Sequence, residues 1–119
     1  MSERGIGAPA DPEDRKIITL ARASRARSGA EQGACVRDTD GRTYAATSVH
    51  LTGLDLSAVQ LAVAMAVSSG AGSLEAAAVV AEQQPDGTDL ALLTTFAGAG
   101  TPLWWAGPDG TVRARLESP

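Results

Sequence analysis

The sequence predicts one α/β domain in which helices pack on a mixed β-sheet. Segments with helix start signals alternate with short apolar runs of strand length, and Gly-containing turns separate them. The chain has 119 residues, 44% of them hydrophobic and 20% charged, which suffices for one modest core and no second domain. Residues 1–10 are rich in Gly, Ala and Pro and are expected to be flexible. The domain is therefore predicted over residues 11–119.

Composition and charge argue against several classes of protein. The net charge of −4 argues against nucleic-acid binding, which needs basic surfaces. The single cysteine, Cys35, can form no disulfide within the chain and cannot build a thiolate metal site alone. The longest apolar stretch, residues 54–67, is too short and too interrupted to cross a membrane. The first 15 residues have no apolar segment typical of a secretory signal, so we expect a cytoplasmic protein.

The first part of the chain predicts a helix followed by two strands. Asp11 can cap the helix, and Pro12 suits its first position. Apolar residues recur at helical spacing from residue 17, and Gly29 is expected to end the helix. Residues 33–37 and 42–51 then predict two strands joined by a turn at Asp40-Gly41.

A second helix is predicted over residues 58–69. Ser57 and Gln60 match a capping box at its start. Residues 61–67 are all apolar, so this helix has almost no polar face. It must therefore be buried in the centre of the domain or at a contact between subunits. The second possibility makes the chain a homo-oligomer, either a dimer or a tetramer.

The remaining segments complete the predicted sheet. Residues 74–80 fit a central strand covered on both faces. Thr88 is expected to cap a third helix over residues 88–96, and residues 102–106 and 111–116 predict the last two strands. The resulting order is α-β-β-α-β-α-β-β. Layers of helices on both faces of a mixed sheet are the natural architecture for this order.

Several local phrases, in this order, resemble the small cytidine deaminases. The phrases lie at residues 33–36, 40–44, 62–70, 76–81 and 102–113. The resemblance covers roughly residues 12–116 and implies the cytidine deaminase fold. It also implies that the second helix and its neighbours form the subunit contacts of a homotetramer.

The residues that carry that family's chemistry are replaced. The family has a Cys-Ala-Glu or His-Ala-Glu phrase at the start of the second helix, where the first residue binds zinc and the Glu moves protons. Counting back from Gly70 puts Ser57 and Val59 at these positions. The family's Pro-Cys-Gly-x-Cys phrase falls on residues 85–89, so Asp86 and Asp89 replace both thiolates. A neutral hydroxyl is a poor zinc ligand, and Val59 can carry no proton.

The nucleoside contacts are replaced as well. The family's Asn-x-Glu pair, which binds ribose, falls on Ser48 and His50, and these are the candidate ligand-binding residues. His50 is the only histidine and could act as a general base. No Ser or Cys nucleophile with a carboxylate to orient the ring is identifiable around it, which favours an ordinary polar residue at a strand end.

A different metal site is the main alternative for the two aspartates. Asp86, Asp89 and Ser57 could form an oxygen-rich site that suits Mg²⁺ or Ca²⁺. Carboxylates are also common near helix N-termini, where the helix dipole stabilises them, and this interpretation is favoured. We therefore predict no metal and no cofactor, although the family resemblance implies zinc.

Three functions are consistent with these patterns. The first is a catalytically inactive deaminase-like protein that acts as an oligomeric binding or regulatory module for itself or another protein. The second is an active nucleoside deaminase with an atypical metal site, which would hold metal and release ammonia from cytidine. The third is a sensor that binds a nucleoside- or nucleotide-type ligand in the remnant pocket. The replaced residues favour the first function.

Overall fold

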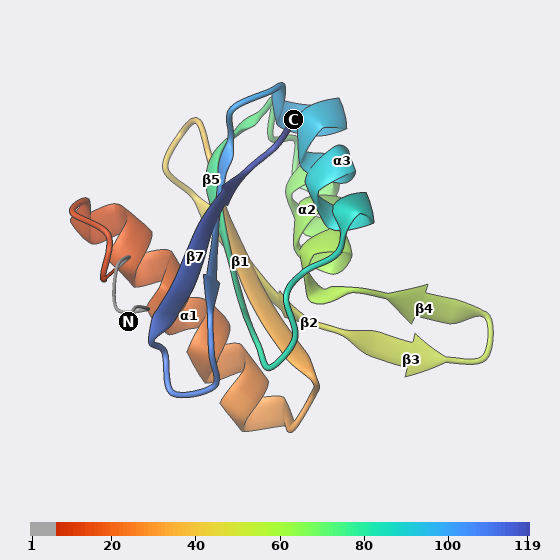
Figure 1. Ribbon diagram of the computed structural model, residues 1–119. Helices are drawn as coiled ribbons and strands as arrows, with labels where there is room; N and C mark the ends of the chain where they lie inside the picture. Colours follow the sequence, from red (N-terminus) through yellow and green to blue (C-terminus); the bar gives the residue numbers. More distant parts are fainter. Residues whose placement is uncertain (1–6) are drawn as a thin grey trace.

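The computed structural model describes residues 7–119 and has three layers. A five-stranded sheet with strand order β2-β1-β5-β6-β7 separates α1 from α2 and α3 (Figure 1). The helices are α1 (Pro12–Ser28), α2 (Ala58–Ser68) and α3 (Gly87–Ala97). The strands are β1 (Gln32–Asp38), β2 (Thr43–Thr47), β3 (Val49–Leu51), β4 (Leu54–Leu56), β5 (Leu74–Ala81), β6 (Pro102–Ala106) and β7 (Val112–Glu117). The predicted α/β class, with helices packed on a mixed sheet, is confirmed.

The N-terminal segment is only partly covered by this description. Residues 1–6, which belong to the segment predicted to be flexible, lie outside the described residues. Within residues 7–10, the carbonyl oxygens of Pro9 and Ala10 accept hydrogen bonds from the Arg15 guanidinium at 2.8 and 2.9 Å. No helix of the described residues is long and apolar enough to cross a membrane.

The central strand β5 holds the two halves of the core together. It pairs antiparallel with β1 and parallel with β6, which makes the sheet mixed. Its side chains alternate between two apolar clusters, one under α2 and α3 and the other under α1. The burial of β5 on both faces agrees with its prediction as a central strand. Cys35, in the neighbouring β1, is fully buried, and burial raises the pKa of its thiol to about 11.

Local capping signals set where the first two helices begin. The Asp11 carboxylate accepts a hydrogen bond from the Glu13 amide at 2.8 Å, and Gly29 ends α1 with a φ of 71°. At α2, the Gln60 amide donates to the Ser57 hydroxyl at 3.0 Å, and the Ser57 amide donates to the Gln60 side chain at 2.8 Å. Both starts are as predicted, because caps depend on neighbouring residues alone.

The strand predicted over residues 42–51 is interrupted at Ser48. The Ser48 hydroxyl accepts the Gln32 amide at 3.1 Å, and the Ser48 amide donates to the Gln32 carbonyl at 3.1 Å. The chain then leaves the sheet, and β3 pairs with β4 in a separate hairpin that projects from the body (Figure 1). The prediction missed β4 because its turn, Thr52-Gly53, is not a strong hairpin signal.

The predicted cap of α3 is wrong. Asp86, not Thr88, is the N-cap, and the helix begins one residue earlier than predicted, at Gly87. The Asp86 carboxylate accepts hydrogen bonds from the amides of Thr88 and Asp89 at 3.1 and 3.3 Å. Thr88 already lies inside the first turn of α3, and its hydroxyl donates to the Asp86 carboxylate instead of capping the helix.

The close packing of α1 on β1 generates a stability prediction. A Cβ added at Gly33 would lie 2.2 Å from the Ala21 carbonyl oxygen, so backbone would have to move. We expect Gly33→Ala to lower the free energy of unfolding by about 1–3 kcal/mol in urea denaturation. Gly72→Ala is the matched control, because nothing lies within 4 Å of its added Cβ. Equal effects of the two substitutions would contradict this account of the packing.

Candidate functional site

The candidate site lies where the N-terminal ends of α2 and α3 meet the base of the β3–β4 hairpin. A pocket of about 280 Å³ occupies this place. Of the positions predicted from the sequence, Ser57, Asp86, Asp89 and His50 line it, and Ser48 and Val59 do not. The complete lining is Glu31, Gln32, His50, Asp55, Ser57, Gln60, Asp86, Thr88 and Asp89.

A hydrogen bond between Ser57 and Asp89 forms the floor of this pocket. The Ser57 hydroxyl donates to the Asp89 carboxylate over 2.7 Å, while it accepts the Gln60 amide as the cap of α2. Asp89 is 2% exposed. Burial raises the pKa of Asp89, the nearby Asp86 charge raises it further, and the bond from Ser57 opposes both effects.

Asp86 has the opposite electrostatic character. Its carboxylate is exposed and accepts hydrogen bonds from the Thr88 hydroxyl and from the first amides of α3. These bonds hold the pKa of Asp86 below its ordinary value. The two aspartates therefore differ, since Asp86 is stabilised as an anion and Asp89 is destabilised as one. This arrangement agrees with the interpretation of Asp86 as a carboxylate placed by a helix N-terminus.

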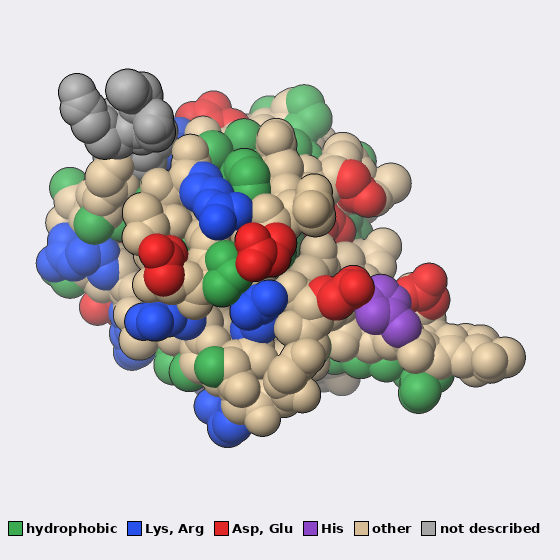
Figure 2. Space-filling view, turned by 60° about the horizontal axis from the view of Figure 1, so that its bottom comes forward, with side chains coloured by type: hydrophobic (Ala, Val, Ile, Leu, Met, Phe, Trp, Pro, Cys, Tyr) green, Lys and Arg blue, Asp and Glu red, His purple; other side chains and the backbone are tan. Residues whose placement is uncertain are grey.

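His50 stands on the hairpin between two carboxylates. Its Nδ1 atom lies 2.6 Å from the Asp55 carboxylate on β4, and its Nε2 atom lies 3.5 Å from the Glu31 carboxylate. Figure 2 shows the histidine between these acidic side chains beside the projecting hairpin. The hydrogen bond to Asp55, together with both negative charges, raises the pKa of His50. Both ring nitrogens of His50 face carboxylates, and the Ser57 hydroxyl donates to Asp89 and not to His50.

Two predicted positions serve the scaffold. Val59, the second residue of α2, is fully buried in the apolar cluster under α2 and α3. Ser48 is 7% exposed and bonds to the backbone of Gln32, as described above. Ser48 thus holds the end of β2 against the start of β1, beside the pocket.

Gln32 is a site residue that the sequence analysis missed. Its side-chain oxygen accepts the Ala58 amide at 3.1 Å, and this contact holds the first residue of α2 against β1. Gln32 also lines the pocket, where its neutral side-chain amide lies among carboxylates. Its position at the first residue of the buried strand β1 is the only local signal, and that signal does not distinguish it from an ordinary surface residue.

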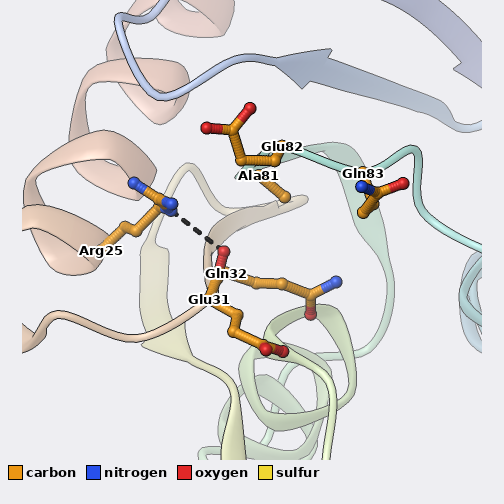
Figure 3. Close-up of a pocket in the computed structure, with 6 residues that line it drawn as sticks. All are labelled: Arg25, Glu31, Gln32, Ala81, Glu82 and Gln83. Carbon is orange, nitrogen blue, oxygen red and sulfur yellow. Dashed lines mark hydrogen bonds between the residues drawn. The ribbon is translucent and has the colours of Figure 1, made fainter.

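A second cavity of about 280 Å³ adjoins the first, because Glu31 and Gln32 line both. It lies at the ends of β1 and β5, beside the C-terminal half of α1 (Figure 3). The Arg25 guanidinium donates to the Glu31 carbonyl at 3.0 Å across its mouth. The other residues that line it are Ala81, Glu82 and Gln83. The side chains that line the two cavities include more carboxylates than basic groups.

The donor set at this site does not fit zinc. In residues 7–119, no group of three or more His, Cys, Asp or Glu side chains is placed to hold a metal ion. The Ser57 hydroxyl already donates its proton to Asp89, and Asp86 is engaged with the amides of α3. Zinc in proteins is held by Cys, His or carboxylate ligands in a tetrahedral set, which these residues do not supply.

Comparison with known proteins decides the family. A family model described as cytidine deaminase-like matches residues 10–110. The chain belongs to the cytidine deaminase-like family. This match confirms the resemblance to cytidine deaminases that the sequence indicates. No curated protein sequence matches it.

Solved structures of cytidine deaminases share its fold. The enzyme from Mycobacterium leprae is 25% identical with a TM-score of 0.68, covering 87% of this chain and 96% of that one. The enzyme from Mycobacterium tuberculosis is 26% identical with a TM-score of 0.66, covering 87% of this chain and 91% of that one. The enzyme from Burkholderia pseudomallei, at 22% identity and a TM-score of 0.73, covers 87% and 91% and shows the fold alone.

The opposite pKa shifts of the two aspartates generate a prediction about pH. The raised pKa of Asp89 means that the folded state binds its proton more readily than the unfolded chain does. Asp89 therefore reduces the free energy of unfolding as the pH rises from about 4 through its folded-state pKa. Over this pH range we therefore expect Asp89→Asn to become more stable relative to the wild type. Urea denaturation at a series of pH values measures the difference between their free energies of unfolding.

Asp86→Asn is the matched control for this experiment. The lowered pKa of Asp86 contributes stability that is present above about pH 4 and lost as the pH falls through its folded-state pKa. As the pH rises, the wild type should therefore gain free energy of unfolding relative to Asp86→Asn. Asparagine is also a good N-cap, so the helix start is retained. Shifts of the same sign in both variants would refute the assignment.

Proposed function

We propose that this chain is a catalytically inactive member of its family that acts as an oligomeric binding module. The observation that carries the proposal is the 2.7 Å hydrogen bond from Ser57 to Asp89. By the family resemblance, both residues occupy positions of zinc ligands. Here the two side chains form a hydrogen bond with each other, so each already has a partner within the chain.

Val59 supports the same conclusion from the side of proton transfer. By the resemblance, it occupies the position of the Glu that moves protons between water and the base. Its side chain has no acid or base group and is fully buried in the core. General acid–base catalysis needs a titratable group within hydrogen-bond reach of the reacting atoms. Without it, deamination of a nucleoside has no proton carrier at this position.

Exposed apolar side chains support the oligomeric part of the proposal. Met65 and Val67 on α2 are 38% and 52% exposed, and Leu51 and Leu54 at the tip of the β3–β4 hairpin are 65% and 48% exposed. Among residues 7–119, these are the large apolar side chains that the isolated chain exposes to water. Association of subunits through these side chains would remove them from water, which is favourable.

The retained pocket supports a second candidate, a sensor without chemistry. The pocket of about 280 Å³ keeps the Gln32 amide and the buried Asp89 carboxylate, which can hydrogen-bond a nucleobase. A ligand that binds only the folded state raises the melting temperature. A thermal-shift series with nucleosides, nucleotides and free bases tests this candidate, and no shift at millimolar concentration would remove it.

Zinc content measured together with ammonia release tests the proposed loss of catalysis. We expect the protein purified without chelator to hold no stoichiometric zinc and to release no ammonia from cytidine. The control is the triple variant Ser57→Cys, Asp86→Cys and Asp89→Cys, which restores the ligand types of the family and should bind about one zinc per chain. One zinc per wild-type chain with ammonia release would identify an active deaminase and refute the proposal.

A further inference from the structure

The edge of the sheet formed by β2 has no partner in the described chain. β2 pairs with β1 on one side only, in register from Gly33 with Thr47 to Arg37 with Thr43. A strand at a sheet edge leaves half of its backbone N–H and C=O groups unpaired. These groups are a template on which another strand can pair.

The direction of the free groups follows from the β1–β2 ladder. At the end of β2, the Ser48 amide donates to the Gln32 carbonyl, so alternate residues counted back from Ser48 bond to β1. The residues that bond to β1 are Ala46 and Tyr44. The residues whose backbone groups face outward are Thr43, Ala45 and Thr47.

The two edges of the sheet differ in how they are protected. The opposite edge, β7, carries three exposed charged side chains on alternate residues, Arg113, Arg115 and Glu117. Proteins use such charges to prevent pairing at free edges. The β2 sequence, Thr-Tyr-Ala-Ala-Thr, has no charge and no proline, and its register with β1 has no bulge. The β2 edge is therefore open to pairing in a way that β7 is not.

A groove of about 350 Å³ runs along this open edge. Its floor is residues 45–47 of β2. One wall comes from α2, through Leu61 and Met65, and is apolar. The other wall comes from the C-terminal half of α1 and carries the cation of Arg27. The wall residues of α1 are Ser24, Arg27 and Ser28.

We propose that β2 pairs with β2 of a second copy of this chain, antiparallel about a two-fold axis at Ala45. Ala45 then lies opposite Ala45 of the second copy, and Thr43 lies opposite its Thr47. Each of these pairs exchanges two backbone hydrogen bonds, so all of the outward-facing groups are satisfied. The two sheets become one continuous sheet.

Charge complementarity favours a second copy over an unrelated strand. Arg27 is exposed beside Thr47, and Asp40 is exposed in the turn just before Thr43. Neither forms an ion pair within residues 7–119. Antiparallel pairing brings the Thr47 end of one copy to the Thr43 end of the other, so each Arg27 faces the Asp40 of the other copy.

The apolar wall is complementary to itself under the same symmetry. A two-fold axis at Ala45 brings the α2 helices of both copies together above the joined sheet, because α2 packs over β2. Leu61 and Met65 of one copy then face the same residues of the other, as a two-fold interface requires. Met65, which is 38% exposed in the single chain, becomes covered.

The test compares the dimer dissociation constants of four variants with that of the wild type, by sedimentation over a range of concentrations. Ala45→Pro removes the outward amide at the axis and leaves the bonds to β1 intact. Arg27→Glu places like charges at both ends of the interface, and Arg27→Glu with Asp40→Arg restores opposite charges. Arg22→Glu is the matched control, because Arg22 lies on α1 but bonds to the Pro108 carbonyl beside the opposite edge.

We expect Ala45→Pro and Arg27→Glu each to weaken the dimer about tenfold or more, the charge swap to restore it, and Arg22→Glu to leave it unchanged. The charge swap should recover the dimerisation that Arg27→Glu loses. The test therefore does not depend on normal folding of Ala45→Pro. Amide exchange gives an independent readout: Thr43, Ala45 and Thr47 should exchange more slowly as the protein concentration rises. Tyr44 and Ala46, already bonded to β1, should change little.

This inference rests on the oligomeric part of the proposed function, and the outcomes separate the two. A monomer at every concentration overturns both the pairing of β2 and the oligomeric module. A stable oligomer that Ala45→Pro and Arg27→Glu do not weaken overturns the pairing of β2 alone. Slowed exchange in β2 that requires an added extended peptide assigns the edge to a peptide and also overturns the pairing with a second copy.

Discussion

The fold depends on the burial of β5 on both faces by small side chains. Successive side chains of this strand, mostly alanine and valine, point alternately to the cluster under α1 and to the cluster under α2 and α3. Such side chains let helices approach the sheet closely, as at Gly33, but each contributes little buried area. On α2, the side chains of Met65 and Val67 remain exposed. At the end of β5 the chain enters the loop that starts α3, and this path fixes Asp86 and Asp89 relative to the sheet.

The candidate site follows from two helix starts that meet at one end of this core. The caps of α2 and α3 are made by Ser57 and Asp86, and the first turn of α3 brings Asp89 to the Ser57 hydroxyl. Helix N-termini favour negative charge, which explains why Asp86 and Asp89 can both lie at the start of α3. The burial of Asp89 opposes this effect, so one pocket holds an aspartate with a raised pKa beside one with a lowered pKa.

The sequence predicts what depends on neighbouring residues and misses what depends on distant ones. The caps at Asp11 and Ser57 are local, and both were predictable. The break at Ser48 was not, because it depends on contacts with Gln32, 16 residues earlier. The Ser57–Asp89 bond joins residues 32 positions apart. Only the family resemblance placed these two residues in one site, and it said nothing of a hydrogen bond between them. Gln32 was missed for the same reason, since its contact with Ala58 crosses from β1 to α2.

The separate β3–β4 hairpin gives the pocket two halves of unequal rigidity. Ser57 and Asp89 are fixed by helix ends that the core holds. His50 and Asp55 are held by a ladder of two short strands outside the main sheet, and such an isolated ladder is only marginally stable in water. A hinge motion of the hairpin would carry one wall of the pocket away from its floor without disturbing any residue of the core. The contact between His50 and Glu31, which joins the hairpin to the body, therefore sets the width of the pocket.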